Sequence, residues 1–212
     1  MGKYSNSNFG DISGKVGNAV GSKWRSIKYV RALGAKSNRP PSTTQLAAQA
    51  RLKLAVMHLR PIKDLLNTGF GDKKLNKISG YNAAVKAFLT NAITGTYPNY
   101  SVDYSKVQLS NGPLSPLSNV ICGLNAPALN ISWLSVPNRF NAFADDEVVA
   151  LVYNETAKVY LIEDSTLRAD QMLSLNTTAA PGDILHIWLF AISRDEQSVS
   201  PSQYAGQLTY AA

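Results

Sequence analysis

The sequence predicts an α+β fold in which a basic, β-rich arm and two helices precede an antiparallel β-sandwich. In residues 1–36, glycine, serine and asparagine separate short β-branched and aromatic runs. Residues 45–60 contain helix formers and neither glycine nor proline, and from about residue 96 β-branched and aromatic runs recur between turn residues. The change of pattern divides the chain into residues 1–95, the basic arm with a helical section, and residues 96–212, the sandwich domain.

Residues 1–36 are expected to form short strands, because closely spaced glycines oppose a helix and the residues between them favour β structure. Gly21-Ser22 is the expected turn between two of these strands. The segment 37–42 contains Pro40-Pro41 and predicts a linker, since proline continues neither a helix nor a central strand.

Two main helices are expected. The first covers residues 45–60 and can be capped by Ser42 or Thr43, and Pro61 should end it. A shorter continuation covers residues 62–66. The second main helix covers residues 81–93, where apolar residues recur at three- and four-residue spacing.

Seven strands are expected in the C-terminal half. Seven strands in about 110 residues are typical of an immunoglobulin-like sandwich. Trp133 lies in an alternating strand and is expected in the core, and residues 184–190 indicate a central strand buried on both faces. The expected strands are residues 101–109, 128–135, 147–153, 158–163, 169–175, 184–193 and 204–210.

Charge is distributed unevenly. Residues 1–86 hold 16 of the 21 Lys and Arg and three of the 14 acids, which makes this section about +13 and the remainder about −6. A cationic section can bind phosphates with release of counterions, or it can dock on the acidic half of a neighbouring copy. Both interpretations indicate binding and assembly rather than catalysis.

The candidate binding residues are cations interleaved with two aromatic residues, the combination that neutralises phosphates and stacks on the bases of single-stranded nucleic acid. The alternative, that the aromatic rings pack on the helices and the cations are merely solvated, stays open. The candidates are Lys15, Lys23, Trp24, Arg25, Lys28, Tyr29, Arg31, Lys36 and Arg39, extended by Arg51, Lys53 and Arg60.

No catalytic residue, metal site or cofactor is expected, and the protein is predicted not to be an enzyme. His58 and His186 have no ligand partners at metal-binding spacing, and the acids 145–147 are best explained as a solvated loop. Residues 14–23 resemble a phosphate-binding loop but lack its flanking strand and helix. Cys122 lies in an apolar run and is expected to be an inert thiol.

No membrane span is expected, since no apolar run approaches the roughly 18 residues required. The first twenty residues contain no continuous apolar stretch. We therefore expect synthesis in the cytoplasm without a conventional signal peptide, and a place within a virion or another assembly.

Two resemblances follow from particular residues. Residues 182–208 form a Gly-Asp turn, an apolar strand, a charged hairpin and a last strand, and are similar to the closing strands of fibronectin type III domains. Nearly the whole chain resembles an uncharacterised Bacteroidota family with a domain of unknown function. This resemblance implies a two-part architecture and no catalytic residue. The segments that carry it include Gly14-Lys15-Val16-Gly17, Trp24, Arg31, Pro40-Pro41, Leu59-Arg60-Pro61-Ile62, Gly69-Phe70, Tyr97-Pro98 and Gly182-Asp183.

The function predicted from these features is that of a non-enzymatic structural or assembly protein, with a virion or shell component as one instance. Its basic section would contact nucleic acid, with single strands favoured, or the acidic face of another copy, and such head-to-tail contacts would make a homo-oligomer. The alternative is a cellular binding module whose fibronectin-like domain recognises a protein or glycan.

Overall fold

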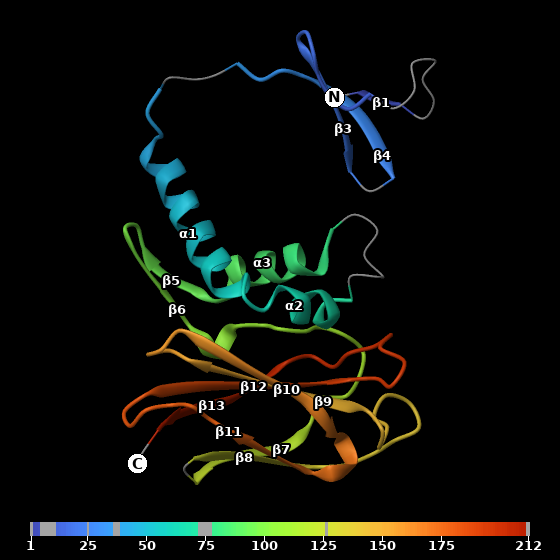
Figure 1. Cartoon of the computed structure of the whole chain (residues 1–212), viewed down its shortest axis with the longest axis vertical. Helices are drawn as coiled ribbons and strands as arrows, with labels where there is room; N and C mark the ends of the chain where they lie inside the picture. The colour runs from blue at the N-terminus through green and yellow to red at the C-terminus, as the bar shows by residue number, and fades with distance from the viewer. Residues whose placement is uncertain are drawn as a thin grey trace. The chain divides into compact units, whose positions relative to one another are not determined.

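The computed structural model describes residues 2–4, 12–24, 26–35, 39–71, 78–125 and 127–210. Contacts divide the chain into two compact units, an N-terminal unit of Met1–Ser42 and a C-terminal unit of Thr43–Ala212 (Figure 1). The boundary expected between residues 95 and 96 follows a change of secondary structure and stays a prediction, whereas the contacts group the helices with the sandwich.

The N-terminal unit contains a four-stranded antiparallel sheet with strand order β1-β4-β3-β2. Its strands are β1 (Gly2–Tyr4), β2 (Gly14–Val16), β3 (Ala19–Trp24) and β4 (Ile27–Ala32). The β-rich character expected of this section is therefore confirmed, and its short strands pair with one another.

The turn expected at Gly21-Ser22 is wrong, because both residues lie inside β3. A Cβ atom built on Gly21 would lie 2.4 Å from the carbonyl oxygen of Ile12, which is closer than real Cβ contacts allow. Glycine is therefore needed here for a close approach of the backbone of Ile12 and not for a turn.

Three α-helices begin the C-terminal unit: α1 (Thr43–Leu59), α2 (Lys63–Gly69) and α3 (Gly80–Asn91). Both main helices and the short continuation are confirmed. Pro61 separates α1 from α2, as expected of a residue that cannot continue a helix.

The sandwich packs a four-stranded sheet, order β10-β9-β12-β13, over a three-stranded sheet, order β11-β8-β7, and all pairings are antiparallel. In chain order, the fourth of the seven strands, β10, pairs with the third, β9. In constant-type immunoglobulin domains the fourth strand instead joins the sheet of the first two. The strands are β7 (Ser118–Asn125), β8 (Ala128–Leu134), β9 (Glu147–Asn154), β10 (Val159–Leu167), β11 (Met172–Asn176), β12 (Ile184–Ile192) and β13 (Gln203–Thr209).

The first expected strand, residues 101–109, is wrong. The chain there forms the end of a separate hairpin, β5 (Ile93–Thr96) with β6 (Asn99–Val102), and then a 3₁₀ turn, η2 (Tyr104–Lys106). The Asp103 carboxylate caps this turn by accepting a hydrogen bond of 3.2 Å from the Ser105 backbone N–H. The first strand of the sandwich is instead β7, in the apolar run that holds Cys122.

The strand expected at residues 169–175 begins late, because a second 3₁₀ turn, η3 (Arg168–Asp170), precedes β11. The other five expected strands are present.

Two cores lie on opposite faces of the four-stranded sheet, and the three helices cover one of these faces (Figure 1). Alternate residues of β9 and β12 enter each core: Leu151 and Phe190 pack toward the helices, while Val152 and Ile187 pack toward the other sheet. The central strand and the buried Trp133 expected from the sequence are confirmed, since Trp133 is 4% exposed.

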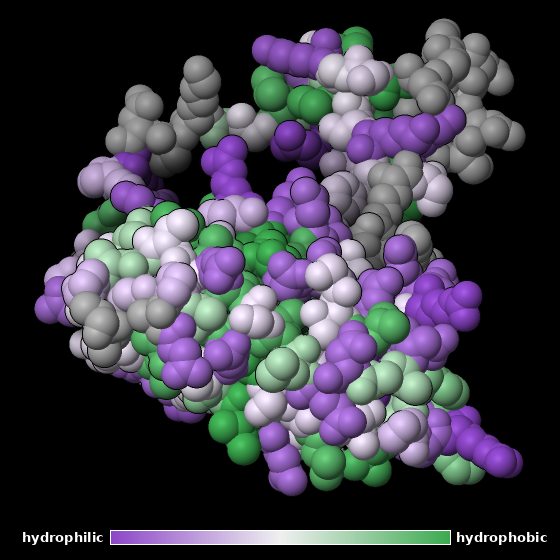
Figure 2. Space-filling view, turned by 60° about the horizontal axis from the view of Figure 1, so that its bottom comes forward, coloured by the Kyte–Doolittle hydropathy of each residue, from purple (hydrophilic) through white to green (hydrophobic). Residues whose placement is uncertain are grey.

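The opposite sheet has an outer surface of mixed character. Figure 2, in which the lower part of Figure 1 comes forward, shows hydrophobic residues interspersed with hydrophilic ones. Ile121 and Met172 are the most exposed apolar residues of β7 and β11, at 66% and 61%. Over the described ranges, no helix combines the length and the apolarity that crossing a membrane requires.

Candidate binding surfaces

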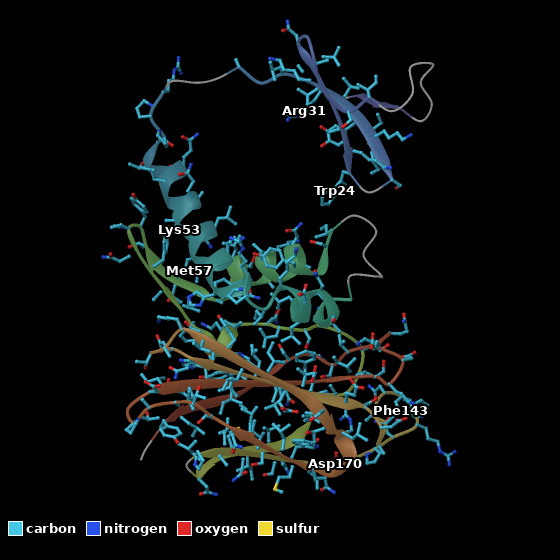
Figure 3. All side chains as sticks on the ribbon, in the orientation of Figure 1. Trp24, Arg31, Lys53, Met57, Phe143 and Asp170 are labelled. Atoms are coloured by element: carbon cyan, nitrogen blue, oxygen red, sulfur yellow. The ribbon has the colours of Figure 1, made fainter. Side chains whose placement is uncertain are left out.

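The strand register places cations and aromatic rings together on one face of the N-terminal sheet. Val20 of β3 lies opposite both Lys15 and Arg31, and Tyr29 lies opposite Lys3. Directly opposed residues point to the same face, and residues two apart along a strand share it. Lys3, Lys15, Trp24, Tyr29 and Arg31 therefore share one face, which we name the basic face. Figure 3 labels two of these residues, Trp24 and Arg31, on the N-terminal sheet.

The cations of the basic face are exposed to solvent, and the residues between them are partly buried. Lys3, Lys15 and Arg31 are exposed, and Tyr29 is half-buried. Trp24 is 46% exposed, at the end of β3. Lys15 and Arg31 lie opposite Val20, near the start of β3, and Trp24 lies at its end. A nucleic-acid strand that runs along β3 can therefore stack a base on the ring while its phosphates approach the cations.

Lys23 and Lys28 lie on the other face of the same sheet, where they oppose each other across β3 and β4. Ile12 covers this face at its centre, since its carbonyl oxygen and Cγ2 lie 2.4 and 2.7 Å from the position of a Cβ on Gly21. The structure therefore separates the predicted cations of the sheet into two groups, and only one group shares a face with both aromatic rings.

The remaining predicted residues are dispersed. Arg25 and Lys36 lie outside the described residues, and Arg39 lies in the segment before α1. Arg51 donates a hydrogen bond of 2.5 Å from Nη2 to the carbonyl oxygen of Leu89 in α3, so this guanidinium joins two helices.

Lys53 on α1 and Arg60 just beyond it are exposed, seven residues apart and hence on one side of the helix. They belong to the C-terminal unit, and their role in binding stays a prediction.

Lys3 was missed by the sequence reasoning. Its strand has three residues, too few for a periodic signal, and only the pairing of β1 with β4 brings it to the basic face.

All of the net charge belongs to the N-terminal unit. Residues 1–42 hold eight Lys and Arg and a single acid, whereas residues 43–212 hold thirteen of each sign. Within the C-terminal unit the signs are separated again, since residues 96–212 hold five Lys and Arg and eleven acids.

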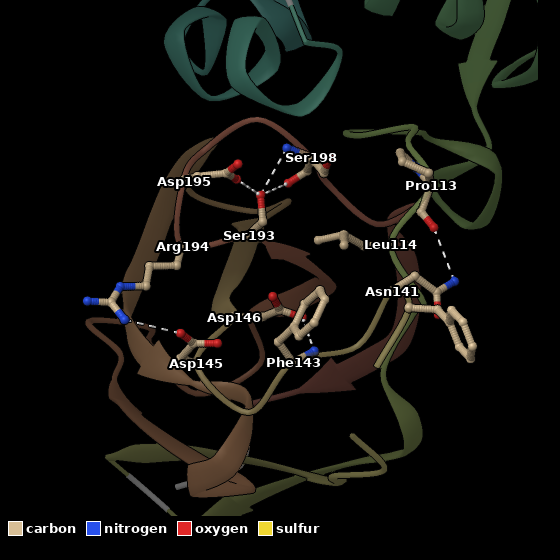
Figure 4. Close-up of a pocket in the computed structure, with 11 residues that line it drawn as sticks. Pro113, Leu114, Asn141, Phe143, Asp145, Asp146, Ser193, Arg194, Asp195 and Ser198 are labelled. Atoms are coloured by element: carbon tan, nitrogen blue, oxygen red, sulfur yellow. Dashed lines mark hydrogen bonds and ion pairs between the residues drawn. The ribbon is translucent and has the colours of Figure 1, made fainter. Parts of the chain in front are cut away.

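A second surface, the loop cavity, was not predicted. It is a cavity of about 570 Å³ at one end of the sandwich, between the segment before β7, the β8–β9 connection and the β12–β13 connection (Figure 4). Phe140 and Phe143 of the β8–β9 connection line it and are 91% and 40% exposed. The one sequence signal for the loop cavity is an aromatic residue, Phe140, that follows a turn-forming residue, Asn138, in the same loop.

Hydrogen bonds hold the loops around the cavity in place. The Asn138 Oδ1 atom accepts bonds of 2.8 Å from the backbone N–H groups of both Phe140 and Asn141. The Asn141 Nδ2 atom donates to the carbonyl oxygen of Pro113 at 3.2 Å, which links two connections. The exposed Phe140 ring is thus carried by a loop whose backbone is fixed.

A buried ion pair supports the floor of the cavity. The Arg168 Nε atom donates to the Asp146 Oδ2 atom at 3.1 Å, and the two side chains are 3% and 1% exposed. Arg168 also donates from Nη2 to the carbonyl oxygen of Ser115, and its own carbonyl oxygen accepts from the Trp133 ring N–H. Arg168 therefore connects the core to the loops that form the cavity.

Both histidines lie between the helices and the four-stranded sheet, where their rings pack against aromatic side chains. His186 lies 2.9 Å from the Tyr204 hydroxyl and 3.1 Å from the Glu155 carboxylate, and its ring stacks on Tyr104 at 4.0 Å. Burial lowers the pKa of His58, which favours its neutral form. The cavity beside His58 is only about 10 Å³, too small for a substrate.

Cys122 is half-buried on β7. Burial raises the pKa of its thiol to about 11, so little thiolate forms near neutral pH.

Solved structures that are similar to this chain include two fibronectin type III domains. The fn3 domain of the human collagen alpha-1(XX) chain has 15% identity and a TM-score of 0.37, and the match covers 47% of this chain and 87% of that domain. The FN5 domain of Drosophila Lar has 12% identity and a TM-score of 0.33, with 47% and 98% covered. No curated protein matches the chain. A family model described as "Family of unknown function (DUF6266)" matches residues 11–206, and the chain therefore belongs to this family.

Proposed function

We propose that this protein is a non-enzymatic binding and assembly protein whose basic face binds single-stranded nucleic acid. One observation carries the proposal: the register that brings Lys15 and Arg31 into one row places them on the same face as Trp24 and Tyr29. The cations would neutralise phosphates and the rings would stack on bases, each stacked base contributing about 1–3 kcal/mol.

The sheet offers its own matched control. Lys15→Gln with Arg31→Gln removes two positive charges from the basic face, and Lys23→Gln with Lys28→Gln removes two from the other face of the same sheet. Binding of a labelled single-stranded oligonucleotide, followed by fluorescence anisotropy across a salt series, should weaken much more in the first variant. Equal weakening would show that total charge alone decides affinity and would contradict the proposal.

Stacking is tested separately. Trp24→Leu removes the ring that would stack on a base, so it should lower the affinity for single strands. It leaves the charge of the sheet unchanged, so the salt dependence of binding should stay the same. A double-stranded oligonucleotide, whose bases are already stacked, should respond little to this substitution. Unchanged affinity for single strands would remove the ring from the binding site.

A virion or shell component is one setting in which such a unit would neutralise a packaged genome while the sandwich makes the contacts between subunits. The alternative function, a binding module for a protein or glycan, is favoured by the loop cavity, where fixed loops present an exposed aromatic ring. It predicts that a version lacking residues 1–42 keeps its partner, whereas nucleic-acid binding requires those residues.

A further inference from the structure

The loop cavity has an acidic lining that includes one buried carboxylate oxygen without a hydrogen-bond donor. Asp145, Asp146 and Asp195 line it, against the single cation Arg194. Asp145 and Arg194 form an ion pair of 3.5 Å whose side chains are 52% and 84% exposed. Solvent screens a pair this open to water and leaves it weak, so a second cation can compete for the Asp145 carboxylate.

Asp146 is the residue that points to an occupant. Its Oδ2 atom is bound by the Phe143 backbone N–H at 3.0 Å and by Arg168. Its Oδ1 atom is buried and has no hydrogen-bond partner among the described residues. Figure 4 shows Asp146 near the centre of the ring of lining residues, with the Asp145–Arg194 pair on one side of it. A buried carboxylate oxygen without a donor is unfavourable, because it has lost its hydrogen bonds to water, and a bound N–H group would relieve this cost.

The lining favours an organic cation over a metal ion. The described residues contain no group of three side chains arranged to hold a metal. The exposed side chains of Phe140 and Phe143 suit a guanidinium or ammonium group, because the face of an aromatic ring attracts a cation. A Lys or Arg side chain also brings the stem that can pack on these rings.

A source of such side chains lies in the chain itself. The N-terminal unit holds eight Lys and Arg against a single acid, and residues 96–212 hold eleven acids against five Lys and Arg. We infer that the loop cavity binds a Lys or Arg side chain from the N-terminal unit of a second copy. Such a contact joins two different surfaces, so it repeats head to tail and builds rings or filaments.

The test measures the association of the full chain by sedimentation velocity at low salt, over a wide range of protein concentration. The cavity variant is Asp145→Asn with Asp195→Asn, and its control is Glu163→Gln with Asp164→Asn on β10, which removes the same charge from residues that do not line the cavity. Asp195→Asn keeps the Oδ1 acceptor that the Ser193 hydroxyl and the Gln197 backbone N–H use, so the loop should stay folded.

We expect the wild-type chain to form larger species, the cavity variant to associate about tenfold more weakly, and the control to behave as wild type. Phe140→Ala, at a side chain 91% exposed, should also weaken association without affecting folding. A wild-type chain that stays monomeric, or two double variants that associate equally, would overturn the inference.

A small probe distinguishes the source of the cation. N-acetyl-arginine methylamide should shift the backbone NMR signals of Phe143 and Arg194, and N-acetyl-glutamine methylamide should not. Probe binding by a chain that never associates would assign the cavity to another protein's side chain and refute the second copy as partner. Nucleic-acid binding should be unchanged in the cavity variant, so the failure of this inference and that of the proposed function are separable.

Discussion

At the scale of single residues, close contacts decide which glycines are required. A Cβ on Gly69, at the end of α2, would lie 2.3 Å from the carbonyl oxygen of Leu109, whereas a Cβ on Gly123 in β7 would meet nothing within 4 Å. Alanine gains up to about 1 kcal/mol over glycine in a helix, but this clash should cost more, about 1–3 kcal/mol. Gly69→Ala should therefore lower the urea midpoint while Gly123→Ala leaves it nearly unchanged. Equal midpoints would show that α2 can move away from Leu109.

A second prediction at this scale concerns His58 and pH. Its folded-state pKa lies below the unfolded value of about 6.5 because burial opposes the charged form. Below that pH the unfolded chain binds a proton that the folded chain binds less readily, so stability should fall as the pH decreases through 6.5 toward the folded pKa.

The measurement is urea unfolding at pH 7.5 and at pH 5.5 for the wild type and for His58→Leu. The variant should lose less stability between the two values, even if it is less stable at both. A loss as large as that of the wild type would assign the pH dependence to other groups.

At the scale of elements, Arg168 joins η3 to the β8–β9 connection and to the segment before β7. Arg168→Leu would leave the Asp146 carboxylate buried without its cation, which should cost about 3–5 kcal/mol. Arg139→Leu, at an exposed position of the same β8–β9 connection, is the control and should change stability by less than about 0.5 kcal/mol. Urea unfolding at neutral pH measures both, and a loss at position 168 no larger than that of the control would show that the buried ion pair does not stabilise the fold.

Also at this scale, the sequence patterns predicted most elements but placed one strand wrongly. The 3.6-residue pattern of α3 and the apolar runs of β9 and β12 were sufficient, because these elements pack against the cores. α1 buries only Ala55, His58 and Leu59, and its helix-forming composition predicted it. Residues 101–109 have a β-rich composition like that of β7, yet a capped 3₁₀ turn interrupts them. The strand that pairs with β8 at the edge of the sandwich is therefore β7. Local composition could not choose between these two candidates, since both are short and the choice depends on which one completes the sheet.

At the scale of the whole molecule, both cores belong to the C-terminal unit. Every member of the two clusters of buried apolar residues lies at residue 55 or later. We therefore predict that residues 43–212 fold alone, with the same main thermal transition as the full chain. Calorimetry of the two proteins checks this, and a markedly lower transition in the shorter protein would show that the N-terminal unit stabilises the cores. The shorter protein should also bind little single-stranded nucleic acid, because it lacks the whole net positive charge.

The sequence by itself determined the order of helices and sheets, the separation of charge along the chain and the buried position of Trp133. These properties depend on periodicity and composition, which are local. It also indicated which cations and rings were candidates for binding, but it could not group them.

The tertiary structure decided the grouping. Only the strand register shows that Lys15 and Arg31 share a face with the two aromatic rings while Lys23 and Lys28 do not, because a shift of one residue would exchange the faces. The same holds for the loop cavity, whose walls come from segments more than 80 residues apart, from Pro113 to Ser198, and are held together by long-range contacts such as the Arg168–Asp146 pair. Contacts between distant segments leave no periodic trace in a single sequence, so the folded chain alone reveals them.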